Sequence, residues 1–222
     1  MAVITISREL GSGGLDIAQQ VAKSLGYEFV DKRTVDGILR QYGLTKFNEV
    51  YSSAPSILDL LNSDNLLIVS MLNEILEALA KRGRVVILGR AGFAVLGRYA
   101  DVLNVHIQAP FSDRVQRVMA REGLPDLQAA EERVRDDDNV HRKYVQRFYN
   151  RHWDEPSAFN LVLDTGTVSS DTAVKQIVEA ARALDQKVPE KDAITTATIE
   201  VDSVLADAVA KVMAYPPQAA MA

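Results

Sequence analysis

The sequence has no cysteine, and this absence removes several kinds of chemistry at once. A chain without cysteine cannot form a disulfide framework, a thiol nucleophile or a cysteine-type zinc site. Histidine is also scarce, and the spacings of His106, His141 and His152 do not match those of metal ligands. We therefore expect no metal site built from the protein's own side chains.

The chain also lacks an excess of basic over acidic residues. The 25 Lys and Arg residues are outnumbered by 30 Asp and Glu residues, which gives a formal net charge of −5. Proteins that bind nucleic acids or anionic membranes in general hold phosphate groups with surplus basic charge. We therefore expect neither a nucleic acid nor a membrane as a partner, and any bound phosphate must be held by local basic clusters and backbone amides.

No apolar run approaches the ~20 residues that a membrane-spanning helix needs. The first residues do not resemble a signal peptide, because a short apolar stretch runs directly into Ser7, Arg8 and Glu9. A length of 222 residues with 47% hydrophobic residues suits a domain with a full core. We expect a cytoplasmic protein.

The first thirty residues contain a clear pattern of strand, glycine loop, helix and strand. Residues 2–6 are apolar and β-branched, and Gly11-Ser12-Gly13-Gly14 follows them closely. Residues 15–25 then place apolar side chains on one helical face, and Gly26 is a natural helix end. Residues 27–30 form a second strand candidate, so the pattern predicts the beginning of a parallel α/β sheet.

Three further apolar runs predict the rest of this sheet. Residues 85–88 form a continuous apolar run before Gly89, which is typical of a strand buried on both faces. Residues 102–107 and 161–163 are two more strand candidates, with helical patterns around 114–121 and 172–184. We expect an α/β fold with about five parallel strands and helical crossovers.

The segments between these strands differ in composition. Residues 34–82 lack a good strand candidate and predict a helical segment. Residues 122–159 are polar and rich in arginine and acidic residues, which favours a helical insert or lid over core. Residues 185–222 predict a linker and a C-terminal extension. In that extension we expect a strand at 194–201, followed by a helix with an apolar stripe at 201–212.

The glycine loop is a candidate phosphate-binding site. A loop between a strand and a helix brings backbone N–H groups close to an anion, and the helix N-terminus adds a partial positive charge. The phosphate-binding candidates are Gly11, Ser12, Gly13, Gly14 and Leu15.

This loop does not satisfy the full pattern G-x-x-x-x-G-K-[ST]. If Gly13 is the last glycine, Gly14 stands at the lysine position and Leu15 at the Ser/Thr position. The loop then lacks the ammonium that reaches the transferring phosphate and the hydroxyl that binds Mg²⁺. Arg8 is a candidate to supply positive charge from the other end of the loop. On this reading, lysine at 14 and threonine at 15 should raise turnover if the rest of the site is intact.

Residues 4–14, with the sequence I-T-I-S-R-E-L-G-S-G-G, resemble the opening of the cytidylate kinase-like family, whose members typically begin I-T-I-S-R-E-[YF]-G-S-G-G. The resemblance covers about residues 1–184. It continues through shorter matches at residues 29–32, 86–91, 117–123, 147–149, 153–156 and 161–165.

The resemblance implies a P-loop NTPase-type three-layer fold for residues 1–184, with a helical acceptor-binding segment at 34–82 and a lid-like insert at 122–159. It implies ATP as the nucleotide and phosphoryl donor, Mg²⁺ if the protein is catalytic, and CMP, dCMP or another small molecule as acceptor. Asp31 and Arg90 resemble acceptor-binding residues. The residues of the lid and its entry that match the family are Arg117, Arg121, Arg135, Asp137 and Arg142. We take Arg8, Arg121 and Arg135 as catalytic candidates.

Several departures from the related true cytidylate kinases fall in the chemistry and not in the fold. Besides Gly14 and Leu15, Ala91 replaces the aspartate that follows the acceptor-site arginine. In the lid, His141 stands where a D-x-x-R pattern starting at Asp138 would place arginine, and Arg142 comes one residue later. Each lid arginine also has a simpler interpretation as part of a solvated helix face, as in the i, i+4 pair Glu131 and Arg135.

Two classes of function therefore remain open. One is a nucleotide-binding kinase for CMP, dCMP or another small acceptor. The other is a catalytically degenerate kinase homologue, or pseudokinase, that senses nucleotide or acts as a structural subunit. The C-terminal extension favours a protein partner or a homo-oligomer, because an amphipathic helix is a common docking element.

Overall fold

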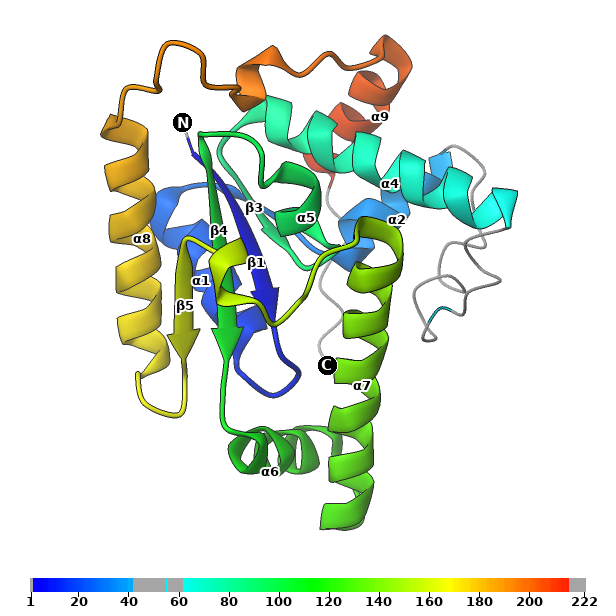
Figure 1. Ribbon diagram of the computed structural model, residues 1–222, viewed down its shortest axis with the longest axis vertical. Helices are drawn as coiled ribbons and strands as arrows, with labels where there is room; N and C mark the ends of the chain where they lie inside the picture. Colours follow the sequence, from blue (N-terminus) through cyan, green and yellow to red (C-terminus); the bar gives the residue numbers. More distant parts are fainter. Residues whose placement is uncertain (1, 42–54, 56–61, 216–222) are drawn as a thin grey trace.

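The computed structural model describes residues 2–41, 55 and 62–215. Its centre is a five-stranded sheet in the order β2-β3-β1-β4-β5, and all its strand pairs are parallel (Figure 1). The strands are β1 (Val3–Arg8), β2 (Glu28–Val30), β3 (Val85–Leu88), β4 (Val102–Gln108) and β5 (Leu161–Asp164). The predicted sheet of about five parallel strands is confirmed.

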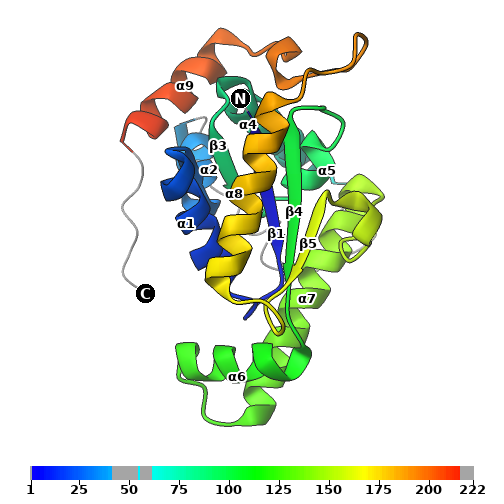
Figure 2. The same cartoon turned by 90° about the vertical axis from the view of Figure 1, so that its left-hand side faces the viewer.

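Helices cover both faces of the sheet and create three layers (Figure 2). α1 and α8 pack on one face; α2, α4, α5, the C-terminal half of α7 and α9 contribute to the core on the other. The helices are α1 (Gly14–Leu25), α2 (Lys32–Gln41), α4 (Ser63–Arg82), α5 (Gly92–Leu96), α6 (Phe111–Glu122), α7 (Leu127–Tyr149), α8 (Ser170–Gln186) and α9 (Ser203–Ala214). In the described part of the chain, no helix has the length and apolarity needed to cross a bilayer.

The central strand β1 shows how the sequence separates the two faces. Ile4 and Ile6 are fully buried in the core beneath α1 and α8. Because neighbouring side chains of a strand point to opposite faces, Thr5 and Ser7 lie on the other side. Thr5 donates a hydrogen bond to Oδ1 of Asn104 at 2.6 Å, and Ser7 accepts one from Nε1 of Trp153 at 2.7 Å. The strand thus presents satisfied polar groups toward the α5–α7 side.

The predicted strand at residues 194–201 is wrong. This segment contains a short 3₁₀ helix, η3 (Thr196–Thr198), and does not join the sheet. The carboxylate of Asp101 accepts hydrogen bonds from the backbone N–H of Thr196 at 2.8 Å and from its hydroxyl at 2.6 Å. Alternating apolar residues predicted a strand. Instead, the carboxylate of Asp101 accepts the backbone N–H of Thr196, so this N–H needs no neighbouring strand.

The apolar stripe of α9 is confirmed, and it is covered by the chain itself. Leu205, Ala208, Val209 and Val212 are buried in the core that includes residues of α2 and α4. α9 contacts both of these helices. The amphipathic face that suggested a protein partner is therefore used within the chain, although Val204 on the same helix is 63% exposed.

Residues 122–159, predicted as a polar insert, fall into two parts. In the first part, Ala130 and Val134 of α7 pack with α6 in a small separate core. In the second part, Tyr144, Val145 and Trp153 are buried in the main core. Within the other predicted segments, residues 42–54 and 56–61 of the acceptor-binding segment and residues 216–222 of the extension lie outside the described residues.

His106 on β4 is a buried titratable residue among aromatic rings. Its side chain lies 5.7 Å from the ring centroid of Trp153 and 4.9 Å from that of Phe159. Burial disfavours the charged imidazolium and lowers the pKa of His106 from 6.5 to about 4. The folded protein therefore holds this residue neutral at pH values where the unfolded chain binds a proton.

We predict that His106→Phe flattens the acid dependence of stability. As the pH falls from 6.5 to about 4, the unfolded state takes up a proton that folded wild type does not, so stability is lost across this window. One pKa unit corresponds to about 1.4 kcal/mol, so this residue removes on the order of 3 kcal/mol. Urea unfolding at pH 7 and pH 4.5 should show a smaller loss for the variant. An equal loss in both proteins would contradict the assignment.

Candidate functional site

The loop between β1 and α1 has its backbone carbonyl groups held from outside. The carbonyl of Glu9 accepts hydrogen bonds from the N–H of Ser12 at 3.2 Å and from its hydroxyl at 2.8 Å. The carbonyls of Leu10 and Gly11 accept from the guanidinium groups of Arg114 and Arg117, at 3.4 and 3.3 Å. These contacts fix the direction in which the loop backbone faces.

A residue that follows β5 also holds a carbonyl of the loop. The hydroxyl of Thr165, directly after β5, donates to the carbonyl of Ser12 at 2.8 Å. Arg117 donates to the hydroxyl and carbonyl oxygens of Thr165, at 3.0 and 3.1 Å. Gly11 has φ +84°, and a Cβ built on it would lie 2.6 Å from the carbonyl oxygen of Arg114. Only glycine allows this close approach of the loop to α6.

The N–H groups at the start of α1 are open. The N–H groups of Gly13, Gly14, Leu15 and Asp16 have no hydrogen-bond acceptor among the described residues. The first N–H groups of any helix lack intrahelical partners and carry the positive end of the helix dipole. This arrangement is suited to hold a phosphate group.

Arg114 links this loop to α6 and α7. It is 5% exposed and donates two hydrogen bonds to the carboxylate of Asp138, at 3.0 and 2.9 Å. Its Nε lies 3.2 Å from the carboxylate of Glu9, which also accepts the N–H of Ala109 at 3.0 Å. Burial raises the pKa of Glu9, although the charge of Arg114 and the bond from Ala109 act against this rise.

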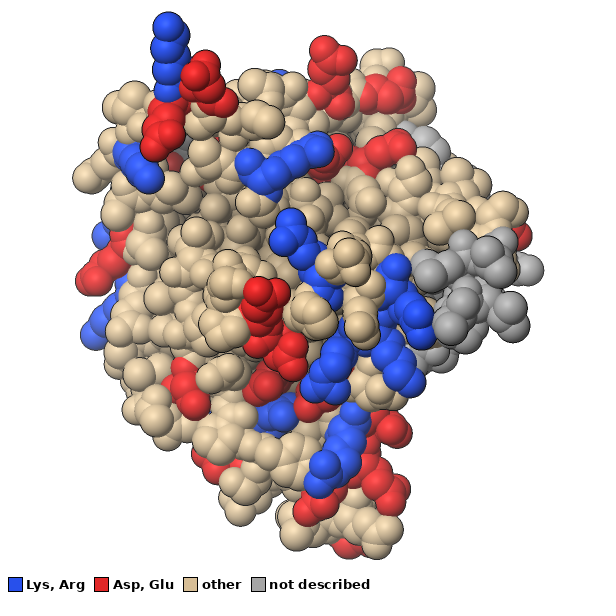
Figure 3. Space-filling model, in the orientation of Figure 1, with Lys and Arg blue, Asp and Glu red and all other residues tan. Residues whose placement is uncertain are grey.

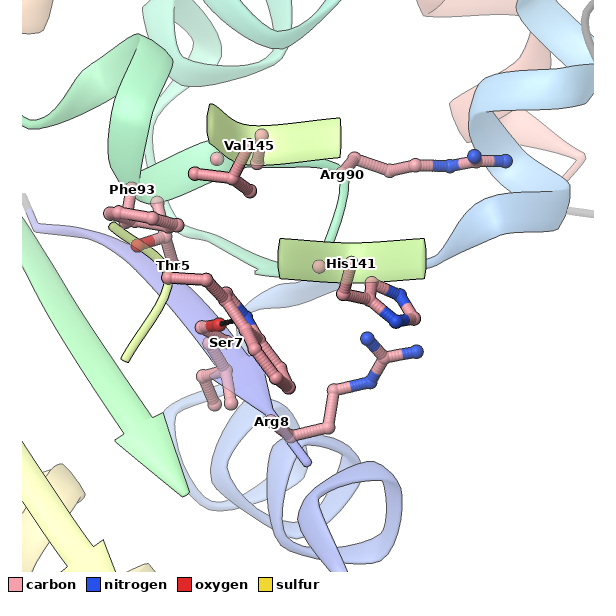
Figure 4. Close-up of a pocket in the computed structure, with 12 residues that line it drawn as sticks. Thr5, Ser7, Arg8, Arg90, Phe93, His141 and Val145 are labelled. Carbon is pink, nitrogen blue, oxygen red and sulfur yellow. Dashed lines mark hydrogen bonds between the residues drawn. The ribbon is translucent and has the colours of Figure 1, made fainter. Parts of the chain in front are cut away.

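A pocket lies beside the loop, at the carboxyl ends of β1 and β3 (Figure 4). Open α/β sheets bind ligands at these strand ends. Its basic side chains are Arg8, from the end of β1, and Arg90, from the turn after β3. His141 and Val145 from α7, together with Trp153, line the opposite side. Figure 4 shows the side chains of Arg8 and His141 pointing toward one another.

Arg90 occupies a constrained position. Its φ is +56°, and Ala91 after it has φ +53°, so two non-glycine residues stand in the left-handed region. Such conformations cost on the order of 1 kcal/mol each and persist where the surroundings enforce them. The Arg90 side chain is 3% exposed, and its Nη2 lies 2.9 Å from Oδ1 of Asp36 on α2. Burial raises the pKa of Asp36, although Arg90 opposes that rise.

Asp137 lies near the same pocket on α7. Its carboxylate lies 3.0 Å from Nδ1 of His141 and 3.3 Å from Nη1 of Arg133. Although burial acts in the opposite direction, the hydrogen bond and charge of His141, followed by the charge of Arg8, lower the pKa of Asp137. Asp137 therefore remains ionised and balances the positive charge of Arg8.

Other candidate residues lie at the surface or have local roles. Arg121 and Arg135 are 55% and 64% exposed, and each is paired with a neighbouring glutamate. Arg142 is 48% exposed and lies 3.7 Å from Asp154. Asp31 accepts the N–H groups of Arg33 and Thr34 at the start of α2. Lys and Arg side chains gather on the face that α7 crosses (Figure 3).

Among the described residues, no group of three or more His, Asp and Glu side chains could hold a metal ion. Any Mg²⁺ here would need ligands from a nucleotide, as is usual for Mg²⁺ in kinases.

Similarity to known proteins extends over the residues of the loop and the pocket. A model of the cytidylate kinase-like family matches residues 3–167. The chain belongs to this family. It is 31% identical over 180 residues to the cytidylate kinase of Ignicoccus hospitalis, which covers 80% of this chain and 97% of that protein. It is 29% identical over 175 residues to the cytidylate kinase of Pyrobaculum aerophilum, which covers 79% and 90%.

Solved structures share this three-layer α/β fold. An uncharacterized protein from Eubacterium ventriosum superimposes with a TM-score of 0.64 at 22% identity, covering 84% of this chain and all of that chain. A Thermus thermophilus protein gives a TM-score of 0.51 at 18% identity, covering 84% and 98%. The family model and the two sequence relatives confirm the resemblance to the cytidylate kinase-like family.

The sequence pattern did not identify Arg114, Thr165 or His141 as parts of this site. Arg114 and Thr165 each follow a strand, near its carboxyl end. Polar residues at such positions are a usable signal, because the carboxyl ends of parallel strands meet at one edge of the sheet. For His141 the sequence showed only that its spacing does not suit a metal ligand and that it departs from the family's lid pattern.

We predict that Arg114→Met destabilises the protein by about 3 kcal/mol, because it leaves Glu9 and Asp138 half-buried without their cation. The matched control is Arg82→Met, which removes an exposed pair with Glu28. That change should cost less than about 1 kcal/mol. Urea unfolding of both variants measures the difference, and similar losses would show that Arg114 does not secure the loop.

Proposed function

We propose that this protein is a nucleotide-binding kinase that transfers the γ-phosphoryl group of ATP to CMP, dCMP or another small acceptor. The observation that carries the proposal is the glycine loop. Arg114, Arg117 and Thr165 hold three of its carbonyls, and four successive N–H groups at the start of α1 have no acceptor among the described residues and are available to a phosphate. Membership of a kinase family supports the same conclusion.

The two substrates would meet at the pocket beside the loop. The N–H groups of residues 13–16 hold the β- and γ-phosphates of ATP, and Arg8 stands at the end of β1 next to them. Arg90 lines the same pocket from the next strand and binds the acceptor's phosphate. Arginine suits this task because its planar guanidinium makes paired hydrogen bonds to phosphate oxygens.

The reaction itself requires little covalent participation from the protein. The bond between the γ-phosphorus and the β–γ bridging oxygen breaks, and a bond forms to an oxygen of the acceptor's phosphate. ADP leaves with the electron pair of the broken bond. Catalysis therefore consists of alignment and of stabilising negative charge on the transferred group. Mg²⁺ that accompanies ATP would neutralise part of that charge.

We further propose that α6 and the first half of α7 serve as the lid. They share a small core that is separate from the main one, and Figure 1 shows them projecting beyond the sheet. Arg121 and Arg135 lie on this unit, where they pair with the carboxylates of Glu122 and Glu131, and Arg135 also lies over the ring of Phe111. A bound nucleotide could replace those weak pairs, because exposed ion pairs contribute little.

The alternative is a catalytically degenerate homologue that binds nucleotide without turnover. Gly14, Leu15 and Ala91 favour it, since each replaces a side chain that the chemistry of true cytidylate kinases uses. Titration with ATP, CTP and CMP, combined with a coupled assay for ADP, separates the two functions. Binding with turnover supports the kinase, and binding without turnover supports a degenerate homologue that senses nucleotide. No binding contradicts both and favours a degenerate homologue that acts as a structural subunit.

We predict that Arg90→Ala weakens binding of a nucleoside monophosphate about 10- to 100-fold, the loss expected for charged hydrogen bonds. ATP affinity should change less than about threefold, because residues 13–16 hold the triphosphate. Calorimetric titration with CMP and with ATP measures both affinities.

Arg98→Ala is a matched control, because Arg98 also pairs with a carboxylate, Glu77 at 2.7 Å, but does not line the pocket. It should leave both affinities unchanged. A melting curve of each variant confirms folding before titration. An equal loss of ATP and CMP binding in folded Arg90→Ala would assign Arg90 a different role.

A further inference from the structure

The basic residue of the phosphate-binding pattern and its first glycine have exchanged places in this chain. In the pattern G-x-x-x-x-G-K, the first glycine stands six residues before the lysine. Here Gly13 is the second glycine, so Gly14 occupies the lysine position and Arg8 occupies the position of the first glycine. A cation is therefore present in the motif, but the last residue of β1, Arg8, carries it.

The side chain of Arg8 passes over the site where a side chain at 14 would begin. A Cβ built on Gly14 would lie 2.5 Å from Cβ of Arg8 and 2.9 Å from its Cγ. Real Cβ atoms do not approach other atoms this closely, and Cβ of Arg8 cannot move without the backbone of β1. The structure therefore admits a side chain at position 8 or at position 14, but not at both.

The head of Arg8 lies between the two proposed phosphate sites. A Cβ built on Gly89 would lie 3.2 Å from Nη1 of Arg8, so the guanidinium rests on the turn that carries Arg90. The stem of the same side chain lies against Gly14, at the open N–H groups of α1. Figure 4 shows the side chain extending from the end of β1 toward His141 on α7.

We propose that Arg8 replaces the missing lysine: its guanidinium binds the transferring phosphate, and Gly14 is glycine because the stem of Arg8 fills the space above it. This inference rests on the proposed function for its ligand, a nucleoside triphosphate. It also corrects the expectation that lysine at 14 with threonine at 15 restores activity. With Arg8 present, the Cβ of a lysine at position 14 would collide with the Cβ of Arg8.

A double-mutant cycle of Arg8→Gly, Gly14→Lys and the double variant tests the exchange. Arg8→Gly should weaken ATP binding about 10- to 100-fold, because it removes charged hydrogen bonds. Gly14→Lys should lower both the melting temperature and the ATP affinity, because its Cβ collides with Arg8. The double variant carries the usual order of the motif, so it should recover ATP affinity to within about tenfold of wild type.

Two exposed positions supply the controls. Gln19→Lys adds a lysine to the exposed face of α1, and Arg182→Ala removes an exposed arginine from α8. Neither should change ATP affinity or the melting temperature appreciably. Calorimetry with ATP and thermal unfolding without ligand are measured for all forms.

ATP affinity and melting temperature together distinguish failure of the exchange between positions 8 and 14 from failure of the proposed function. If wild type binds no ATP, the proposed function fails, and with it the role of Arg8 as a phosphate ligand. If wild type binds ATP but Arg8→Gly binds it equally well, only the role of Arg8 is overturned. If Arg8→Gly does not relieve the melting-temperature loss of Gly14→Lys, the steric exchange is overturned whatever the ATP result.

Discussion

The site depends on the hydrogen bonds that hold the carbonyl groups of the glycine loop. Two guanidinium groups from α6 and one hydroxyl after β5 hold the carbonyls of three successive residues, 10–12. In a trans peptide group the N–H points away from the carbonyl, so the bond from Thr165 to the carbonyl of Ser12 turns the N–H of Gly13 away from Thr165. The N–H groups of Gly14, Leu15 and Asp16 are open because they form the first turn of α1. The contacts made by α6 and by Thr165 after β5, which are distant in sequence, hold the loop that leads into this turn.

The proposed function requires a protein with net charge −5 to hold a phosphate. Much of the attraction comes from oriented backbone dipoles, which do not appear in a count of charged residues. Fixed dipoles are also effective for catalysis, because they do not have to reorient when charge develops. Side-chain cations then need to act at only a few points, at the ends of β1 and β3, and Asp137 and Asp36 balance their charge.

The loss of the usual lysine does not by itself decide between a kinase and a degenerate homologue. What matters is whether a cation can reach the transferring phosphate, and Arg8 starts from a position that allows this. Ala91 stands where the true cytidylate kinases have an aspartate. It lies in a left-handed turn beside the buried Arg90. Asp36, from α2, supplies a carboxylate partner to that arginine.

Much of the fold could be read from local patterns, whereas the contacts of the site could not. The run at 85–88 predicted a strand because burial on both faces leaves a continuous apolar signature. The alternating pattern at 194–201 gave a wrong strand, because a single distant carboxylate, Asp101, accepts the backbone N–H of Thr196. The glycine loop was predicted as a phosphate site. The contacts of Arg114 and Thr165 with the loop were not, because no local pattern encodes pairs more than a hundred residues apart.

The most direct test of the account is the response of the backbone amides at the start of α1 to nucleotide. In a ¹⁵N-labelled sample titrated with ATP, the amide resonances of Gly13, Gly14, Leu15 and Asp16 should shift downfield together and saturate at one affinity, since each N–H gains an acceptor. Amides of the exposed face of α8 should remain in place. If ATP binds but these four resonances do not move, the phosphate lies elsewhere and the central claim is contradicted.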